Sequence, residues 1–156
     1  MLVLGVKNIY EKIVIGFDGS ASSRLALQKA CELGERFGSE LNVVLVIEPL
    51  DVYYGEPIPD VEISKQKEAA NMIIEKAKKI AANYKIKNVN YMVKYGVPAN
   101  EIMKTATDIK ADLIVVGRKS KKGLLEKVLL GSVSQSIVNL SKDIDVLITP
   151  YIEPTD

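Results

Sequence analysis

A basic loop between two glycines is the part of this sequence best suited to chemistry. The loop, 117–123, reads Gly-Arg-Lys-Ser-Lys-Lys-Gly and follows an apolar run, 113–116. The pair Gly131-Ser132 then opens a segment with helical spacing. Free N–H groups at a helix start attract anions, and glycine lets the backbone come close to them. The pattern is typical of a phosphate site, although a lysine-rich connection with a serine N-cap would use the same residues.

A second polar group, Asp18-Gly19-Ser20, follows the first apolar run of the chain. The Asp18 carboxylate is a short acceptor suited to a base amine or a ribose hydroxyl. It could equally serve as the N-cap or Asx-turn of the helix that follows. The two polar groups can form one site only if the fold brings them to one edge.

The elements that would position these groups alternate along the chain. Short apolar, β-branched runs predict five buried strands, at 12–18, 41–47, 89–93, 111–116 and 145–149. Apolar residues at helical spacing predict four helices between and after them, at 21–37, at 63–84, from Pro98 to Ile109, and at 131–140. Gly38 is expected to end the first helix, and Pro98 to occupy the first turn of the third.

Strict alternation of apolar strands with helices predicts an α/β fold, with a parallel sheet covered by helices on both faces. Ligands of such sheets bind at the carboxyl ends of the strands, where the winding reverses. Asp18 and the loop after Gly117 both follow strands directly, so both lie at this end. The pattern does not determine the order of the strands.

Length and composition narrow the classes of function. A chain of 156 residues predicts a single domain spanning 1–156. A net charge of +1, without aromatics interleaved in the basic loop, argues against nucleic-acid binding. No run approaches the length of a transmembrane helix, so we expect a cytoplasmic protein without a membrane partner. The absence of histidine excludes His-based catalytic triads, and the lone Cys31 is expected to be a small buried hydrophobe.

Two common nucleotide motifs do not match. A P-loop requires Gly-Lys-Ser/Thr after four intervening residues, but the residue at that distance from Gly117 is Lys122. A dinucleotide fingerprint requires three spaced glycines after the first strand, and the turn that begins at Gly16 lacks them. If the loop after Gly117 binds phosphate, it must do so with a different arrangement of residues from these two motifs.

Four motifs, taken in chain order, resemble the universal stress protein family. They lie at 13–20, 111–117, 129–134 and 146–148, and the resemblance extends from Lys12 to Pro150. It implies a five-stranded parallel sheet in the order 3-2-1-4-5, the adenine nucleotide alpha hydrolase-like fold. Strands one and four would then be neighbours, and Asp18 and Gly117 would face one crevice.

The resemblance also implies a nucleoside subsite for ATP, which many family members bind. Gly16 and Asp18 would contact the nucleoside at the end of the first strand. Val46, near the end of the second strand, would contact the adenine through its backbone and its side chain. Val116 and Gly117 would line the ribose and the α-phosphate.

The phosphates would lie along the loop and the start of the last helix. Lys119 and Ser120 would line the triphosphate. Gly131, Ser132 and Val133 would supply backbone N–H groups and a hydroxyl to the β- and γ-phosphates. Magnesium would be held mostly by the phosphates and water, as this strongly hydrated ion prefers.

The loop departs from the family's Gly-x2-Gly-x9-Gly-Ser/Thr pattern at two points. Ser120 stands where the second glycine is expected, and ten residues rather than nine separate it from Gly131. Gly123 could supply the flexibility that Ser120 lacks. We expect ATP binding to persist, since Gly117, Gly131 and the basic side chains remain.

The expected function is an ATP-binding regulatory module of the stress response that acts as a nucleotide-dependent dimeric switch. The resemblance implies a homodimer through the edge strand between Asp145 and Pro150, and a further protein partner that the sequence does not identify. The sequence offers no clear acid pair or general base, so we expect at most slow ATP hydrolysis. The alternatives are a dimeric interaction module that does not bind ATP, and an enzyme on the same fold.

Overall fold

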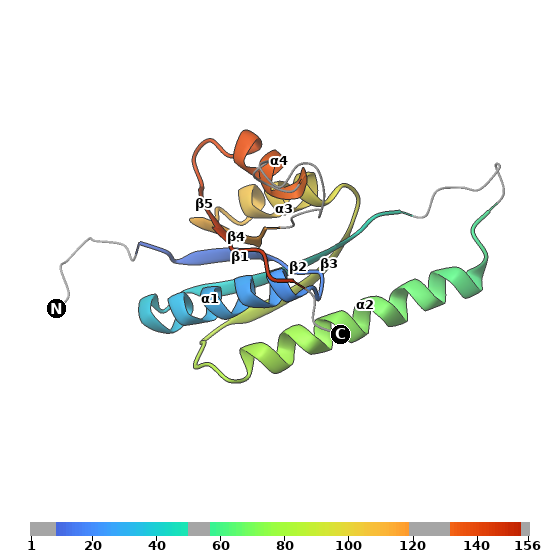
Figure 1. The fold of residues 1–156 in the computed structure, drawn as a ribbon, viewed down its shortest axis with the longest axis horizontal. Helices are drawn as coiled ribbons and strands as arrows, with labels where there is room; N and C mark the ends of the chain where they lie inside the picture. Colours follow the sequence, from blue (N-terminus) through green and yellow to red (C-terminus); the bar gives the residue numbers. More distant parts are fainter. Residues whose placement is uncertain (1–8, 50–56, 119–131, 154–156) are drawn as a thin grey trace.

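The computed structural model describes residues 9–49, 57–118 and 132–153 (Figure 1). Strands and helices alternate along this part of the chain. Their bounds, in chain order, are β1 Lys12–Gly16, α1 Ala21–Phe37, β2 Glu40–Ile47, α2 Asp60–Ala81, β3 Val89–Tyr95, α3 Pro98–Asp108, β4 Leu113–Gly117, α4 Ser132–Leu140 and β5 Asp145–Thr149.

The five strands form one parallel sheet in the order β3-β2-β1-β4-β5. Helices α1 and α2 cover one face of the sheet, and α3 and α4 cover the other (Figure 1). The α/β class and the strand order implied by the family resemblance are therefore confirmed. The order places β1 between β2 and β4, so the winding reverses between β1 and β4.

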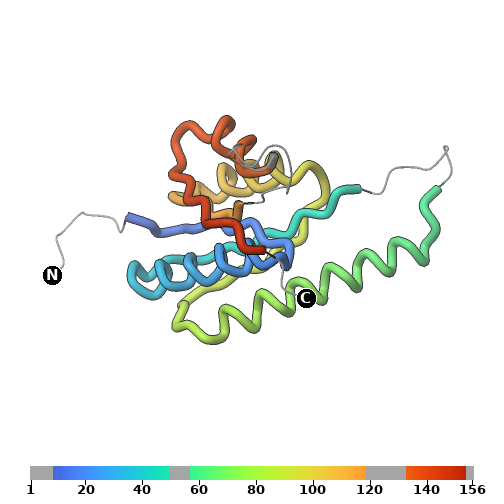
Figure 2. Tube along the Cα trace, viewed as in Figure 1, coloured from blue at the N-terminus to red at the C-terminus, as the bar shows by residue number. Residues whose placement is uncertain are grey.

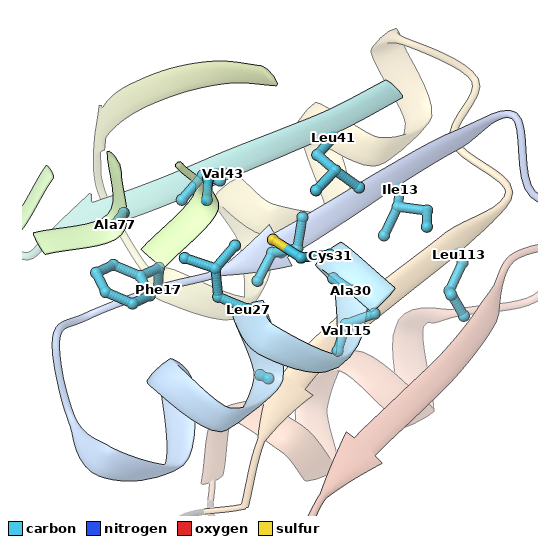
Figure 3. Packing of buried hydrophobic residues seen from close by; sticks show 13 residues of the cluster. Ile13, Phe17, Leu27, Ala30, Cys31, Leu41, Val43, Ala77, Leu113 and Val115 are labelled. Carbon is cyan, nitrogen blue, oxygen red and sulfur yellow. The ribbon is translucent and has the colours of Figure 1, made fainter. Parts of the chain in front are cut away.

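Each face of the sheet has its own apolar core. Ile13 and Ile15 of β1 pack on the α1 side, and Val14 packs on the α3 side, because side chains alternate along a strand. Figure 3 shows the α1-side core, in which Leu27 and Cys31 of α1 lie against the sheet. Burial of such side chains stabilises the fold by roughly 1.5–3 kcal/mol for each large aliphatic residue. The continuous apolar strands are explained by this burial on both faces.

Helix α1 has the bounds that the sequence predicts because both of its ends are set locally. The Ser20 side chain accepts a hydrogen bond from the Ser23 N–H, which satisfies one of the open donors of the first turn. Gly38 ends the helix with a φ of 68°, a left-handed conformation that favours glycine. The prediction for Gly38 is confirmed.

Several other boundaries differ from the prediction. Helix α2 begins at Asp60 rather than 63, directly after the extended Pro59, and ends at Ala81 rather than 84. Its buried residues are Ala70, Ile74, Ala77 and Ala81. The last residues of the predicted helix instead form a turn, whose backbone N–H groups bond to carbonyls three or four residues earlier.

Strand ends differ because pairing partners, rather than local composition, determine them. Strand β3 continues two residues past the predicted end, to Tyr95, which lies opposite Ile47 of β2. Strand β1 ends at Gly16 rather than Asp18. The chain beyond β1 is thereby free to turn toward α1 and toward the pocket described below.

Helix α2 extends well beyond the sheet at its amino-terminal end (Figure 2). Its first ten residues, 60–69, are exposed except for the half-buried Gln66. Among the residues that the structure describes, no helix has both the length and the apolar character to cross a membrane.

Candidate functional site

A pocket of about 340 Å³ opens at the carboxyl ends of β1, β2 and β4. This volume lies near the lower end of the range for small-molecule sites, about 300–1,000 Å³. The lining residues come from all three strands, from the residues that follow β1 and β2, and from the amino-terminal parts of α1, α3 and α4. They are Gly16, Phe17, Asp18, Ser20, Ser23, Val44, Val46, Glu48, Pro98, Ile102, Val116, Gly117, Val133 and Ser134.

Six of the ten residues predicted for the site line this pocket: Gly16, Asp18, Val46, Val116, Gly117 and Val133. Ser132 is the first residue of α4, whose start borders the pocket. Lys119, Ser120 and Gly131 lie outside the described residues. The fold thus brings together the ends of β1 and β4, as the resemblance implied.

Asp18 is anchored at the turn between β1 and α1. One of its carboxylate oxygens, Oδ1, accepts a hydrogen bond from the Ser20 N–H at 2.9 Å. The Asp18 N–H donates to the Ser23 hydroxyl at 3.3 Å. The Asx-turn that was the structural alternative for Asp18 is present, and Ser20, not Asp18, is the N-cap of α1. Because a carboxylate accepts several hydrogen bonds, an Asx-turn at this residue does not exclude a contact with a ligand.

Gly117 is required by packing as well as by its place beside the pocket. A Cβ atom at this position would lie 2.6 Å from the backbone carbonyl carbon and oxygen of Ser22 in α1. Real Cβ atoms essentially never come so close to another heavy atom, so only glycine fits. The φ of Gly117 is not in the left-handed region, and close approach alone is the reason.

The start of α4 borders the pocket. The first N–H groups of a helix lack partners within the helix, and the helix dipole favours negative charge beside them. Val133 and Ser134, in the first turn of α4, line the pocket. The buried Ser134 hydroxyl donates to the Gly117 carbonyl at 3.3 Å and so joins this turn to the end of β4.

The pocket also has an apolar wall. It is built from branched side chains on β2, β4, α3 and α4: Val44, Val46, Val116, Ile102 and Val133. Most of these residues belong to the core cluster on the α3 side of the sheet or pack against it. Such a wall suits the flat face of a base or another apolar group.

Sequence reasoning missed several residues of the pocket. Ser134 follows Val133 in the first turn of α4, and that position was a usable signal. Glu48 continues the alternation of Val44 and Val46 on β2, so the strand period could have found it. Pro98 and Ile102 come from α3, and only the tertiary structure reveals their contribution.

The charged side chains among the described lining residues are all acidic and lie on one side of the pocket. Asp18 and Glu48 are the only ionisable side chains of this described lining, and both lie toward β1 and β2. The α4 start lies toward β4. Among the described residues, no group of three or more His, Cys, Asp or Glu side chains could hold a metal ion. The pocket therefore offers hydrogen-bond acceptors on one side and helix N–H groups on the other.

Cys31 lies in the core, away from this pocket. Its side chain is fully buried, as predicted. Burial, with a smaller effect of the nearby Glu35 and Glu32 carboxylates, raises the pKa of the thiol to about 12. The thiol is therefore neutral at ordinary pH and unsuited to nucleophilic chemistry.

Residues 9–150 match the sequence model of the universal stress protein family. The universal stress protein MJ0531 of Methanocaldococcus jannaschii is 36% identical over 135 residues, which cover 85% of this chain and 78% of that protein. The putative universal stress protein SSP1056 of Staphylococcus saprophyticus is 35% identical over 141 residues, covering 89% and 83%.

Two solved structures resemble the fold closely. The protein MJ0577 superposes with a TM-score of 0.78 at 26% identity, covering 94% of this chain and 99% of that one. A universal stress protein solved in complex with cAMP superposes with a TM-score of 0.72 at 25% identity, covering 90% and 97%.

Proposed function

The chain belongs to the universal stress protein family, and from this membership we propose that it binds an adenine nucleotide, ATP with Mg²⁺, in the pocket at the switch point of the sheet. The bound nucleotide would control a dimeric regulatory module of the stress response. A structural relative at 25% identity was solved with the nucleotide cAMP, which supports this class of ligand.

The observation that carries the proposal is the polarity of the pocket. The α4 start lies at the β4 side, where N–H groups and the helix dipole favour phosphate. Asp18 lies at the β1 side, where a carboxylate favours the hydroxyl and amine donors of a nucleoside. An apolar wall, including Val46 and Val116, lies beside both. A nucleotide has the same sequence of groups: an anion, a sugar and a flat base.

The proposed contacts follow from this orientation. Gly16 and Asp18 contact the nucleoside, and Val46 contacts the adenine. Val116 and Gly117 line the ribose and the α-phosphate. The phosphates would be contacted by the remaining predicted residues: Lys119, Ser120, Gly131, Ser132 and Val133. Mg²⁺ would be held mostly by the phosphates and water.

Regulation rather than turnover is the proposed role. The chain contains no histidine, and its sequence offers no clear acid pair or general base to activate water. Hydrolysis of ATP is therefore expected to be slow at most. Phosphate release at about 1 per second or faster, a typical enzyme rate, would contradict this role.

Dimerisation through β5 completes the proposal. Strand β5 is at the edge of the sheet, and edge strands are usually covered or paired. Antiparallel pairing with β5 of a second copy would satisfy both edges. Because β5 is hydrogen-bonded to β4, which lines the pocket, the nucleotide site and the dimer edge are one strand apart.

Calorimetric titration of the nucleotide-free protein with ATP and Mg²⁺ tests the site. We expect a dissociation constant near micromolar, equivalent to about −8 kcal/mol. Asp18→Asn keeps an oxygen able to accept from the Ser20 N–H but removes the charge, whereas Asp18→Ala removes both. We expect both variants to weaken binding by at least about tenfold, because each alters an acceptor beside the nucleoside.

Asp108→Asn, on the exposed end of α3, is the matched control and should bind as the unaltered protein does. Thermal melting of each variant separates loss of binding from loss of folding. If the unaltered protein gives no heat at high micromolar ATP, the proposed function is wrong. The dimeric interaction module that does not bind ATP would then replace it.

A further inference from the structure

Strand β3 is the edge of the sheet opposite β5, and none of its seven residues is buried. The Asn88 carbonyl accepts from the Leu41 N–H at 2.9 Å, and the Gly96 N–H donates to the Ile47 carbonyl at 3.0 Å. The even-numbered residues of β3 therefore turn their backbone groups toward β2, and the odd-numbered residues turn theirs outward. The part of the sheet that the structure describes has no further strand on that side.

Basic residues lie along this open edge. Residues 76–100, which include the end of α2 and all of β3, contain six lysines and no aspartate or glutamate. Lys87 is exposed two residues before β3, and Lys94 is half-buried within it. Lys78 of α2 is also exposed, and its Nζ lies 5.7 Å from the centre of the Tyr91 ring on β3.

The carboxylates near this segment come from other parts of the chain. They include Glu75 at Lys78, Glu32 and Glu35 near Tyr84, and Glu101 beside Gly96. The charged residues at 82–95, which include β3 and the chain that leads into it, are all lysines. Strand β5, the other edge of the sheet, instead contains an aspartate and no lysine. The two edges of the sheet therefore differ in charge.

From the open backbone and the charge of β3, we propose that this edge binds an extended, acidic segment of a partner protein. The segment adds to the five-stranded sheet as a further strand. Main-chain hydrogen bonds give affinity in this mode of binding, and side chains give specificity. The outward backbone groups belong to Val89, Tyr91, Val93 and Tyr95. Lys87 and Lys94 attract the carboxylates of the partner.

Charge distinguishes this occupant from a second copy of the chain. Pairing of two β3 strands would bring Lys87 and Lys94 of each copy close to those of the other, and like charges destabilise strand pairs. Lysine on an edge strand commonly prevents such self-pairing. A nucleic acid would match the charge but has no backbone N–H and C=O groups at strand spacing. An acidic, extended peptide matches both the charge and the backbone.

The probe is a fluorescein-labelled peptide, Asp-Val-Glu-Val-Asp-Val-Glu, titrated with the full chain at low salt while its anisotropy is measured. We expect a dissociation constant of about 100 μM or lower. A fully N-methylated form keeps the charges but has no backbone N–H to donate, and it should bind at least about fivefold more weakly. Equal binding of the two forms would show that charge alone acts, and would overturn strand addition.

Lys94→Glu replaces attraction with repulsion at the edge and should weaken binding of the peptide by about fivefold or more. Lys29→Glu, at an exposed position of α1, changes the net charge equally and should bind as the unaltered protein does. Melting curves verify that both variants are folded. Full affinity in Lys94→Glu would exclude this edge as the binding surface.

Two further outcomes would overturn the proposal. One is failure of the unaltered protein to bind the peptide. The other is tighter binding of a short DNA duplex than of the peptide, because the lysines would then serve a nucleic acid. Each of these results leaves the nucleotide site untouched, since the β3 edge contributes no residue to the described lining of the pocket.

Discussion

The backbone of Ser22 lies directly against Gly117, so that a Cβ atom on the glycine would be 2.6 Å from the Ser22 carbonyl. Two further contacts hold Ser22 in place. Its carbonyl accepts from the Thr149 hydroxyl at 3.4 Å, and its own hydroxyl accepts from the Ile152 N–H at 3.1 Å. The first turn of α1 is thereby tied to the ends of β4 and β5, beside the proposed nucleotide site.

Gly117→Ala is predicted to destabilise the fold because the added methyl group meets backbone rather than a flexible side chain. Overpacking of this kind typically costs about 1–3 kcal/mol. We expect the free energy of unfolding, measured by urea denaturation, to fall by about 2 kcal/mol or more.

Gly16→Ala is the natural comparison for this prediction. A Cβ atom at Gly16 would lie 2.9 Å from the end of the Ile102 side chain and 3.1 Å from a Val116 methyl group. Because Ile102 can change its rotamer, we expect a smaller loss of stability than at Gly117. Equal losses at the two positions would show that the contact with Ser22 is not what makes glycine necessary.

Ser20→Ala is predicted to weaken the start of α1. The variant loses the side-chain oxygen that accepts from the Ser23 N–H, and loss of such a cap typically costs about 1 kcal/mol. Urea denaturation should show this loss. Ser20→Asp restores an acceptor and should recover most of it, whereas no difference between the alanine and aspartate variants would contradict the capping role.

Stability is predicted to fall at alkaline pH because Cys31 is held neutral in the folded protein. Burial raises the pKa of its thiol from 9.0 to about 12. Above pH 9 the unfolded chain loses this proton and the folded protein keeps it, so rising pH favours unfolding. Urea denaturation should give a free energy of unfolding about 1.4 kcal/mol lower at pH 10 than at pH 7.5.

Three tyrosines are also expected to lower the free energy of unfolding as the pH rises further. Burial is the largest cause that raises the pKa of Tyr10, Tyr84 and Tyr91 above 10.0. Cys31→Ala separates the two effects, since it should remove the fall that begins near pH 9 and keep the one above pH 10. If the alanine variant loses stability as steeply as the unaltered protein between pH 8 and 10, the assignment to Cys31 is wrong.

The dimer predicted through β5 can be measured by light scattering. At micromolar concentration we expect twice the 17.1 kDa mass of one chain. A monomeric mass for the unaltered protein would exclude this interface.

The elements that sequence reasoning placed best are those whose ends depend on neighbouring residues. Ser20 and Gly38 determine α1 through contacts within a few residues, and Pro98 starts α3 in the same way. The end of β3 was missed because it depends on pairing with Ile47, a residue distant in the chain. No local pattern carries that information.

The residues of the candidate site likewise include some that the local sequence predicts and some that only the tertiary structure brings together. The sequence determined which strand ends and which helix start would carry polar residues, because apolar periodicity and glycine placement are local properties. Only the tertiary structure decided that Pro98 and Ile102 join them, and that Gly117 must be glycine because Ser22 lies against it. The reason is physical: a pocket and a close approach are made by segments distant in the chain, and packing alone determines which residues meet.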